Sequence, residues 1–121
     1  MKKKFAGTTS NWETVAFILI ENILVGNNPY FNRRELMKAE HLIFAVKLLE
    51  FVFQHKKAPK ASESTLQRTI QNMRDKNWIQ FLGSGEYKLT KKGIDELEKI
   101  KEAGFSYDVL GAAMRDADLI P

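Results

Sequence analysis

Several side chains that hydrogen-bond to nucleic acids follow one another at helical spacing in the segment "STLQRTIQNM". Ser64, Arg68 and Gln71 fall on one face of a helix with this period, and Gln67 and Asn72 flank them. In the major groove of DNA, arginine can make two hydrogen bonds to guanine, and glutamine or asparagine can do the same with adenine. The spacing therefore favours a helix that reads base edges; the alternative is a helix face that is only solvated.

Phosphate contacts are expected around this helix. Hydroxyl groups at its beginning suit a phosphate, because free backbone amides and the helix dipole favour an anion there. Lysines of the preceding segment "HKKAPK" can add affinity without reading sequence, although loops carry lysines for solubility as well. The candidate phosphate contacts are Lys56, Lys57, Lys60, Ser62, Ser64, Thr65 and Lys88.

The segment after this helix predicts a β-hairpin. Leu66, Ile70 and Met73 give the helix an apolar stripe for the core, and polarity alternates after Asn77 as it does in strands. A three-residue loop at Gly83-Ser84-Gly85, with Gly85 in the left-handed conformation, would place the large apolar residues on one face. The expected pairs are Leu82 with Glu86, Phe81 with Tyr87, Gln80 with Lys88 and Ile79 with Leu89, with Phe81 and Tyr87 buried.

Capping signals predict the helices that precede this unit. Ser10 and Glu13 form a capping box before "VAFILIENILV", whose apolar residues cover nearly the whole circumference, so this helix belongs in the core or in a subunit interface. Asn32 and Glu35 repeat the signal before one long helix, or a closely joined pair, that reaches about His55. Ser62 or Ser64 is expected to cap the following helix.

Two helices are predicted after the hairpin. Thr90 is the expected cap of a helix whose inward residues are Ile94, Leu97 and Ile100. The end of the chain is too apolar to be free in solution, and a short helix over 107–116 would place several apolar residues on one face. Helix, tight hairpin, helix is the order of a winged helix-turn-helix.

Composition excludes several kinds of function. The 121 residues include no cysteine, which removes disulfides, thiolate nucleophiles and Cys-ligated zinc. Glu13, Glu21 and Asn22 confine the first apolar run to Val15–Ile20, too short for a signal peptide, and a cytoplasmic protein is expected. The formal charge of +4 permits a polyanionic partner.

Neither catalysis nor metal binding is expected. Asp75 and the Glu86-Tyr87-Lys88 segment imitate the spacing of metal-dependent nucleases, but the first strand of the hairpin would keep the two carboxylates apart. His41 and His55 lack metal-ligand spacing and are expected at the surface or at an interface. No phosphate loop or cofactor fingerprint occurs, so we expect no enzyme, no cofactor and no metal.

The hairpin region resembles known DNA-binding families. "YKLTKKGIDEL" is similar to a strand-to-helix junction, Tyr-x-Leu-Thr-x-x-Gly-x-x-x-Leu, of PadR-like and multiple-antibiotic-resistance-type repressors. "MRDKNWIQFLGSGEYKL" more closely resembles the C-terminal winged helix of Dam-replacing, methyl-directed type II restriction endonucleases, without their nuclease domain. This resemblance implies DNA binding by the helix that starts near Leu66. The chain differs from this family in two ways: Asn77 stands where the family usually has a glycine at the end of that helix, and the segment 33–60 is longer than expected.

The sequence thus predicts a mainly α protein with a small β-hairpin, a winged helix-turn-helix. Residues 1–10 are expected to be a flexible basic N-terminus, 11–104 the winged helix-turn-helix domain and 105–121 a helical tail on the core or on a partner. The expected partner is double-stranded DNA, with a homodimer through the Val15–Val25 helix and the tail, and no membrane. The expected function is that of a transcription regulator or a restriction-related accessory factor. The alternative is a protein-interaction module, an inhibitor or assembly factor that uses Trp78, Phe53 or the tail.

Overall fold

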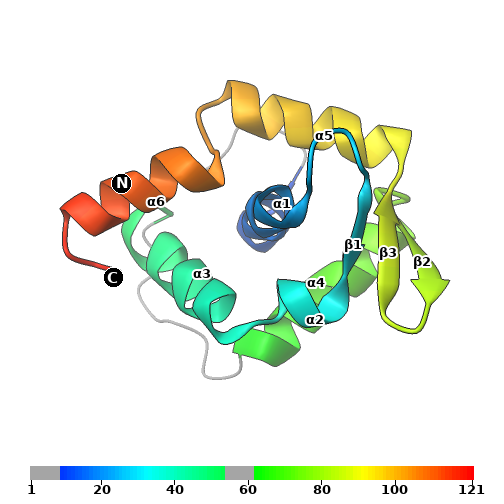
Figure 1. The fold of residues 1–121 in the computed structure, drawn as a ribbon, viewed down its shortest axis with the longest axis horizontal. Coiled ribbons are helices and arrows are strands. Elements are labelled where there is room, and N and C mark those ends of the chain that lie inside the picture. The colour runs from blue at the N-terminus through cyan, green and yellow to red at the C-terminus, as the bar shows by residue number, and fades with distance from the viewer. Residues whose placement is uncertain (1–8, 54–61) are drawn as a thin grey trace.

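The computed structural model describes residues 9–53 and 62–121, to which all structural statements here refer. Helices dominate, and a small antiparallel sheet lies at one side of the molecule (Figure 1), so the prediction of a mainly helical chain with a β-hairpin is confirmed. The elements in chain order are α1 (Asn11–Ile23), β1 (Tyr30–Asn32), α2 (Arg33–Leu36), α3 (Ala39–Phe51), α4 (Ser62–Asp75), β2 (Ile79–Gly83), β3 (Glu86–Leu89), α5 (Lys91–Glu102) and α6 (Tyr107–Asp116).

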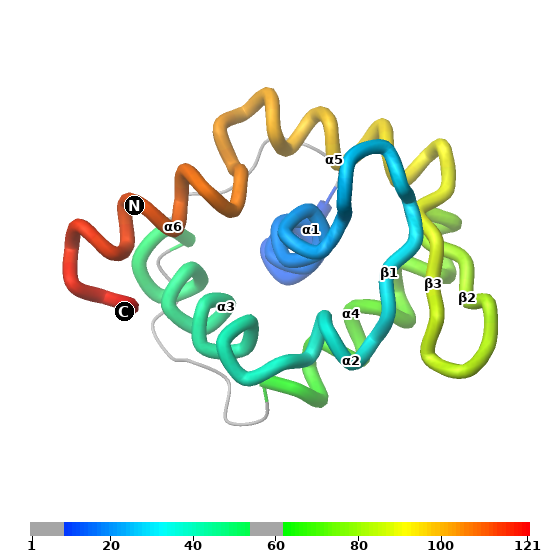
Figure 2. The backbone as a smooth tube through the Cα atoms, in the orientation of Figure 1, coloured from blue at the N-terminus to red at the C-terminus, as the bar shows by residue number. Residues whose placement is uncertain are grey.

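Helix α1 is the centre of the core. Its predicted capping box is confirmed: the Glu13 amide donates to the Ser10 hydroxyl, and the Ser10 amide donates to the Glu13 carboxylate over 2.8 Å. The helix is viewed nearly end-on in the middle of Figure 2, with the other helices and the sheet around it. All side chains from Val15 to Ile20 have 0% exposure, so the other elements of this same chain bury them.

The sheet contains a strand that the sequence did not reveal. Its order is β1-β3-β2, and β1 pairs antiparallel with β3, with Phe31 opposite Tyr87. The two aromatic rings stack at 5.5 Å between centroids. A strand of only three residues is too short to show an alternating pattern, which explains why periodicity missed it.

The hairpin register is confirmed for three of the predicted pairs and wrong for the fourth. Phe81, Gln80 and Ile79 face their predicted partners, but Glu86 pairs with Gly83, and Leu82 lies in a bulge. Ser84 has φ 51° and Gly85 has φ 76°, so both turn residues are left-handed, as a tight two-residue hairpin turn requires. Because Leu82 is an extra residue on β2 with no partner on β3, Phe81 still pairs with Tyr87 beyond the turn.

Two residues predicted to be buried are exposed. The Phe81 ring lies 5.2 Å from the Tyr87 ring, as expected of cross-strand neighbours, but the side chain is 42% exposed. The guanidinium group of Arg74, not an apolar residue, covers that ring at 4.9 Å. Ile94 is 40% exposed, because Gly93 and Glu96 take inward positions of α5 next to Leu97.

The junction of α4, the hairpin and α5 explains the motif around Thr90. Asn77, two residues after the end of α4, has φ 62°. Glycine adopts this left-handed conformation most readily, and asparagine tolerates it. The Thr90 hydroxyl donates to the Asn77 carbonyl over 2.6 Å and accepts from the Gly93 amide over 3.0 Å, so Thr90 caps α5 as predicted. A Cβ atom on Gly93 would overlap the carbonyl group of Trp78. Only glycine therefore allows α5 to approach this closely.

The segment before α4 is a closely joined helix pair. Asn32 caps the short α2, as predicted, and a break at Met37 and Lys38 separates α2 from α3. Helix α3 ends at Phe51, before the predicted end near His55, a residue outside the described part of the chain. Ser62 and Ser64 both lie within α4, so neither precedes it as a cap.

His41, which was predicted to lie at the surface or at an interface, is completely buried within the chain. Its Nδ1 atom lies 3.1 Å from the Leu36 carbonyl oxygen, which can only accept, so Nδ1 carries the proton. Nε2 then accepts from the Asn22 amide over 3.0 Å. Burial lowers the pKa of His41 below its ordinary value, and the neutral ring is the form that fits this site.

Helix α6 has the predicted bounds and packs against the core. Phe105, Leu110 and Met114 are buried, and the Tyr107 amide donates to the Glu21 carboxylate of α1 over 2.8 Å.

Within residues 9–53 and 62–121, no helix combines the length and apolar character needed to cross a membrane.

Candidate nucleic-acid interface

Helix α4 presents the polar face that the sequence predicts. Leu66, Ile70 and Met73 are buried against the core. On the outer side Ser64, Arg68, Gln71 and Asn72 are exposed, whereas Ser62, Thr65 and Gln67 are half-buried. Lys56, Lys57 and Lys60 lie outside the described residues, so their position relative to this face stays a prediction.

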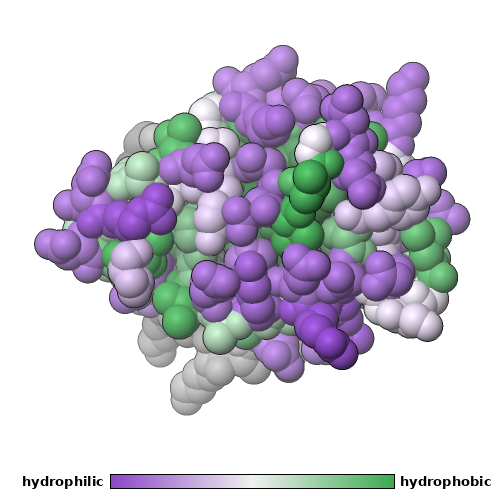
Figure 3. All heavy atoms as spheres, in the orientation of Figure 1, coloured by the Kyte–Doolittle hydropathy of each residue, from purple (hydrophilic) through white to green (hydrophobic). Residues whose placement is uncertain are grey.

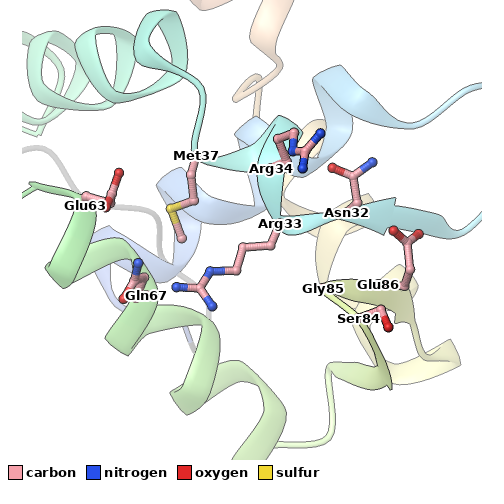
Figure 4. A pocket seen from close by; sticks show the side chains of 9 residues that line it. All are labelled: Asn32, Arg33, Arg34, Met37, Glu63, Gln67, Ser84, Gly85 and Glu86. Carbon is pink, nitrogen blue, oxygen red and sulfur yellow. The ribbon is translucent and has the colours of Figure 1, made fainter.

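A groove of about 580 Å³ separates α4 from the beginning of α2 and the hairpin turn. Figure 4 shows Arg33 reaching from α2 across this groove toward Gln67 of α4, while Arg34 points in another direction. Ser84 and Glu86 line the hairpin side. The Arg33 amide donates to the Gly85 carbonyl over 2.8 Å, which holds the beginning of α2 against the hairpin turn on one side of the groove.

A smaller hollow of about 220 Å³ lies next to this groove, between α4, α2 and β3. We call it the arginine hollow. No carboxylate is among its described lining residues, although Glu63 and Glu86 line the adjacent groove. The arginine hollow is lined by Arg33, Met37, Gln67, Ile70, Gln71, Arg74 and Tyr87.

The arginines of this surface are not neutralised by acids. Among the described residues, the ion pairs join Lys38 to Glu40, Lys76 to Glu13, Lys99 to Glu96 and Lys101 to Glu98. None of these pairs involves Arg33, Arg34, Arg68 or Arg74, which stand on α2 and α4. The positive charge of this side is therefore available to an anionic ligand.

Gln71 differs from the other predicted base contacts, because its amide group is already oriented. Its Nε2 donates to the Asp75 carboxylate over 3.1 Å, and its Oε1 accepts from Arg74 over 3.3 Å. For Arg68, Gln67 and Asn72, by contrast, no side-chain hydrogen bond is found within the described part of the chain.

Lys88 does not join these residues. Tyr87 lines the arginine hollow, and consecutive strand residues point to opposite faces of a sheet, so Lys88 belongs to the other face. Its ammonium group lies 5.8 Å from the centre of the Tyr30 ring. Lys88 therefore lies on the other face of the hairpin, away from the arginine hollow, and its contact with a phosphate stays a prediction.

Sequence reasoning missed Arg33, Arg34 and Arg74. The signal for Arg74 was present, since it follows Gln71 by three positions and Gln67 by seven, which is the spacing of one helix face. For Arg33 and Arg34 the signal was two cations in the first turn after a capping asparagine, where the helix dipole favours acids. Their proximity to α4 depends on β1, which was not predicted.

No group of three or more histidine, aspartate or glutamate side chains within residues 9–53 and 62–121 could hold a metal ion. Comparison of the chain with protein-family models, curated proteins and solved structures found no match.

Proposed function

We propose that this protein is a winged helix-turn-helix DNA-binding protein that inserts α4 into the major groove, as a transcription regulator or a restriction-related accessory factor. The observation that carries the proposal is the arginine hollow, where two guanidinium groups and two glutamine amides gather with no carboxylate among the described lining residues. Guanidinium and amide groups match the acceptors and donors of phosphates and base edges.

The arrangement of elements supports this assignment. In the proposal, α4 is the recognition helix, and the β2–β3 hairpin is the wing beside it. The hydrogen bond from Arg33 to Gly85 aligns the wing turn with the beginning of α2, so α2, α4 and the wing border one groove. The resemblance of "MRDKNWIQFLGSGEYKL" to the winged helix of methyl-directed restriction endonucleases points the same way.

The test is binding of the full chain to a fluorescently labelled random-sequence duplex at low salt, followed by anisotropy. Replacing Arg33 and Arg34 with alanine should weaken binding about tenfold or more, because two phosphate contacts are lost. The matched control is Lys101→Ala, which also removes a positive charge but lies on α5 in an exposed ion pair with Glu98 at 3.7 Å. If the wild-type chain failed to bind any duplex at low salt, DNA binding would be refuted.

The second candidate is a protein-interaction module. Trp78 and Phe53, which the sequence suggested as contact residues, are 3% and 0% exposed and are not available to a partner. An observation on the wing favours another surface. Strand β2 is an edge of the sheet, and its Phe81 and Leu82 are 42% and 45% exposed. An edge strand with apolar side chains can pair with a strand of a partner. An absence of duplex binding together with capture of a β-strand peptide would favour this candidate.

A homodimer remains part of the proposal, with a smaller surface than the sequence suggested. Because Val15–Ile20 are fully buried, they cannot meet a second copy, whereas Val25, just beyond the end of α1, is 78% exposed. Figure 3 shows an apolar patch near the middle of a largely hydrophilic face, over the end of α1. On the tail, Val109 is 60% exposed. Sedimentation of the chain alone and with duplex tests this dimer.

A further inference from the structure

Arg74 is the most constrained arginine of the candidate interface. Its guanidinium group lies over the face of the Phe81 ring, 4.9 Å from the ring centre. The same group donates to the amide oxygen of Gln71 over 3.3 Å. Two contacts of different kinds therefore hold one flexible side chain, while no ion pair of the described residues neutralises it.

The ring beneath Arg74 belongs to an aromatic column that continues into the core. Phe81 lies 5.2 Å from Tyr87, and Tyr87 stacks on Phe31 at 5.5 Å. Tyr87 and Phe31 are 6% and 3% exposed, so the inner part of the column is rigidly packed. The column explains why Phe81, a large aromatic residue, remains half exposed at the surface: its outer face supports the guanidinium group.

Gln71 is oriented by the same network. Its amide oxygen accepts from Arg74, and its amide nitrogen donates to Asp75. One lone pair on the oxygen and one hydrogen on the nitrogen remain free, which is the donor and acceptor pair that recognises adenine. Arg74 can only donate to the amide oxygen, and Asp75 accepts from the amide nitrogen, so the amide group cannot rotate by 180° without losing both hydrogen bonds. The orientation of the Gln71 amide is therefore set before a ligand binds.

We propose that Arg74 and Gln71 act as one preorganised base-reading unit, with Arg74 specifying a guanine and Gln71 an adenine in neighbouring base pairs of duplex DNA. This inference rests on the proposed function. Residues three apart on a helix are displaced by about 4.5 Å along its axis, close to the spacing of about 3.4 Å between base pairs. Phe81 is a positioning residue, because it acts through Arg74.

Preorganisation is the reason to assign sequence reading to Arg74 rather than simple attraction to phosphate. A phosphate can be contacted by a mobile arginine from many directions, whereas two hydrogen bonds to a base edge require a fixed guanidinium plane. Holding the side chain before binding also avoids much of the entropy lost when it is immobilised. Arg34 of the same groove has neither an aromatic support nor a hydrogen-bonded side chain among the described residues, and it serves as the matched comparison.

The experiment is selection of preferred duplexes from a random-sequence pool by the full chain, with Arg74→Ala, Phe81→Leu and Arg34→Ala variants. The wild type should select a guanine and an adenine at neighbouring positions. Arg74→Ala should lower affinity for that duplex about tenfold or more, but for random duplex only about twofold, and the guanine preference should disappear. Phe81→Leu keeps an apolar residue and should relax the same guanine preference. Arg34→Ala should weaken both duplexes equally and leave the selected sequence unchanged.

The outcomes separate this inference from the proposed function. If the wild type binds DNA and Arg74→Ala selects the same sequence as the wild type, the base-reading unit is refuted and DNA binding stands. The inference is equally refuted if Arg74→Ala weakens specific and random duplex to the same degree, which would make Arg74 a phosphate contact. If the wild type binds no duplex, the proposed function itself fails.

Discussion

Two glycines on helices should respond in opposite ways to the same substitution. Gly93 lies in the first turn of α5 and Gly111 in the middle of α6, and both are buried. Helix propensity alone predicts that alanine would stabilise either helix by about 1 kcal/mol. The surroundings differ, because a Cβ atom on Gly93 would overlap the backbone carbonyl of Trp78, whereas one on Gly111 would meet only the flexible end of Arg115, at 3.4 Å, and Phe44, at 3.6 Å.

Gly93→Ala should therefore lower the free energy of unfolding by about 2–3 kcal/mol, since the cost of overpacking against a backbone exceeds the gain in helix propensity. Gly111→Ala should raise it by about 0.5–1 kcal/mol. For a chain of this size the melting temperature changes by roughly 3–6 °C per kcal/mol, so calorimetry should show a decrease near 10 °C for Gly93→Ala and an increase of a few degrees for Gly111→Ala. A Gly93→Ala protein that melts at or above the wild-type temperature would refute the close approach of α5 to Trp78.

Other stability measurements test the packing that positions α4. Lys76→Met should lower the free energy of unfolding in urea by about 1–2 kcal/mol, because the buried Glu13 carboxylate loses a partner at 2.7 Å. The control Lys101→Met should lower it by less than about 0.5 kcal/mol, and equal effects of the two substitutions would contradict this reasoning. Burial lowers the pKa of His41, so the unfolded chain binds the proton more readily, and stability should be greatest above about pH 6.5 and decrease below it. His41→Gln should remove that part of the pH dependence, and an unchanged profile would show that His41 is not its source. Phe81→Ala should cost only about 1 kcal/mol, against about 3–5 kcal/mol for the buried Phe31→Ala, and the reverse order would contradict the assigned exposures.

Local chemistry explains why much of the fold could be predicted from the sequence. The capping residues Ser10, Asn32 and Thr90 all act as predicted, because each bonds to an amide within three positions along the chain. The stripe of α4 and the bounds of α6 follow from helical period in the same way. Such features depend on neighbours in sequence, which a reader of the sequence can see.

Several mispredictions have another origin, since they depend on contacts between different elements of the chain. Strand β1 exists because β3 pairs with it, and its three residues have no pattern of their own. Phe81 was expected in the core, but Arg74 of α4 covers its ring. His41 is buried because Asn22 and Leu36 satisfy its ring nitrogens. The same reason explains why only part of the candidate interface was predicted. The polar face of α4 follows from the spacing of its own residues, whereas Arg33 comes close to α4 only because β1 pairs with β3.

The salt dependence of duplex binding tests the central claim most directly. If Arg33, Arg34 and their neighbours contact phosphates, the logarithm of the association constant should decrease linearly with the logarithm of salt concentration, with a slope of about 0.9 per phosphate contacted. Arg33→Ala should reduce that slope by about one, and Lys101→Ala should leave it unchanged. Binding that is insensitive to salt, or a slope that Arg33→Ala does not alter, would contradict the assignment of this surface to DNA.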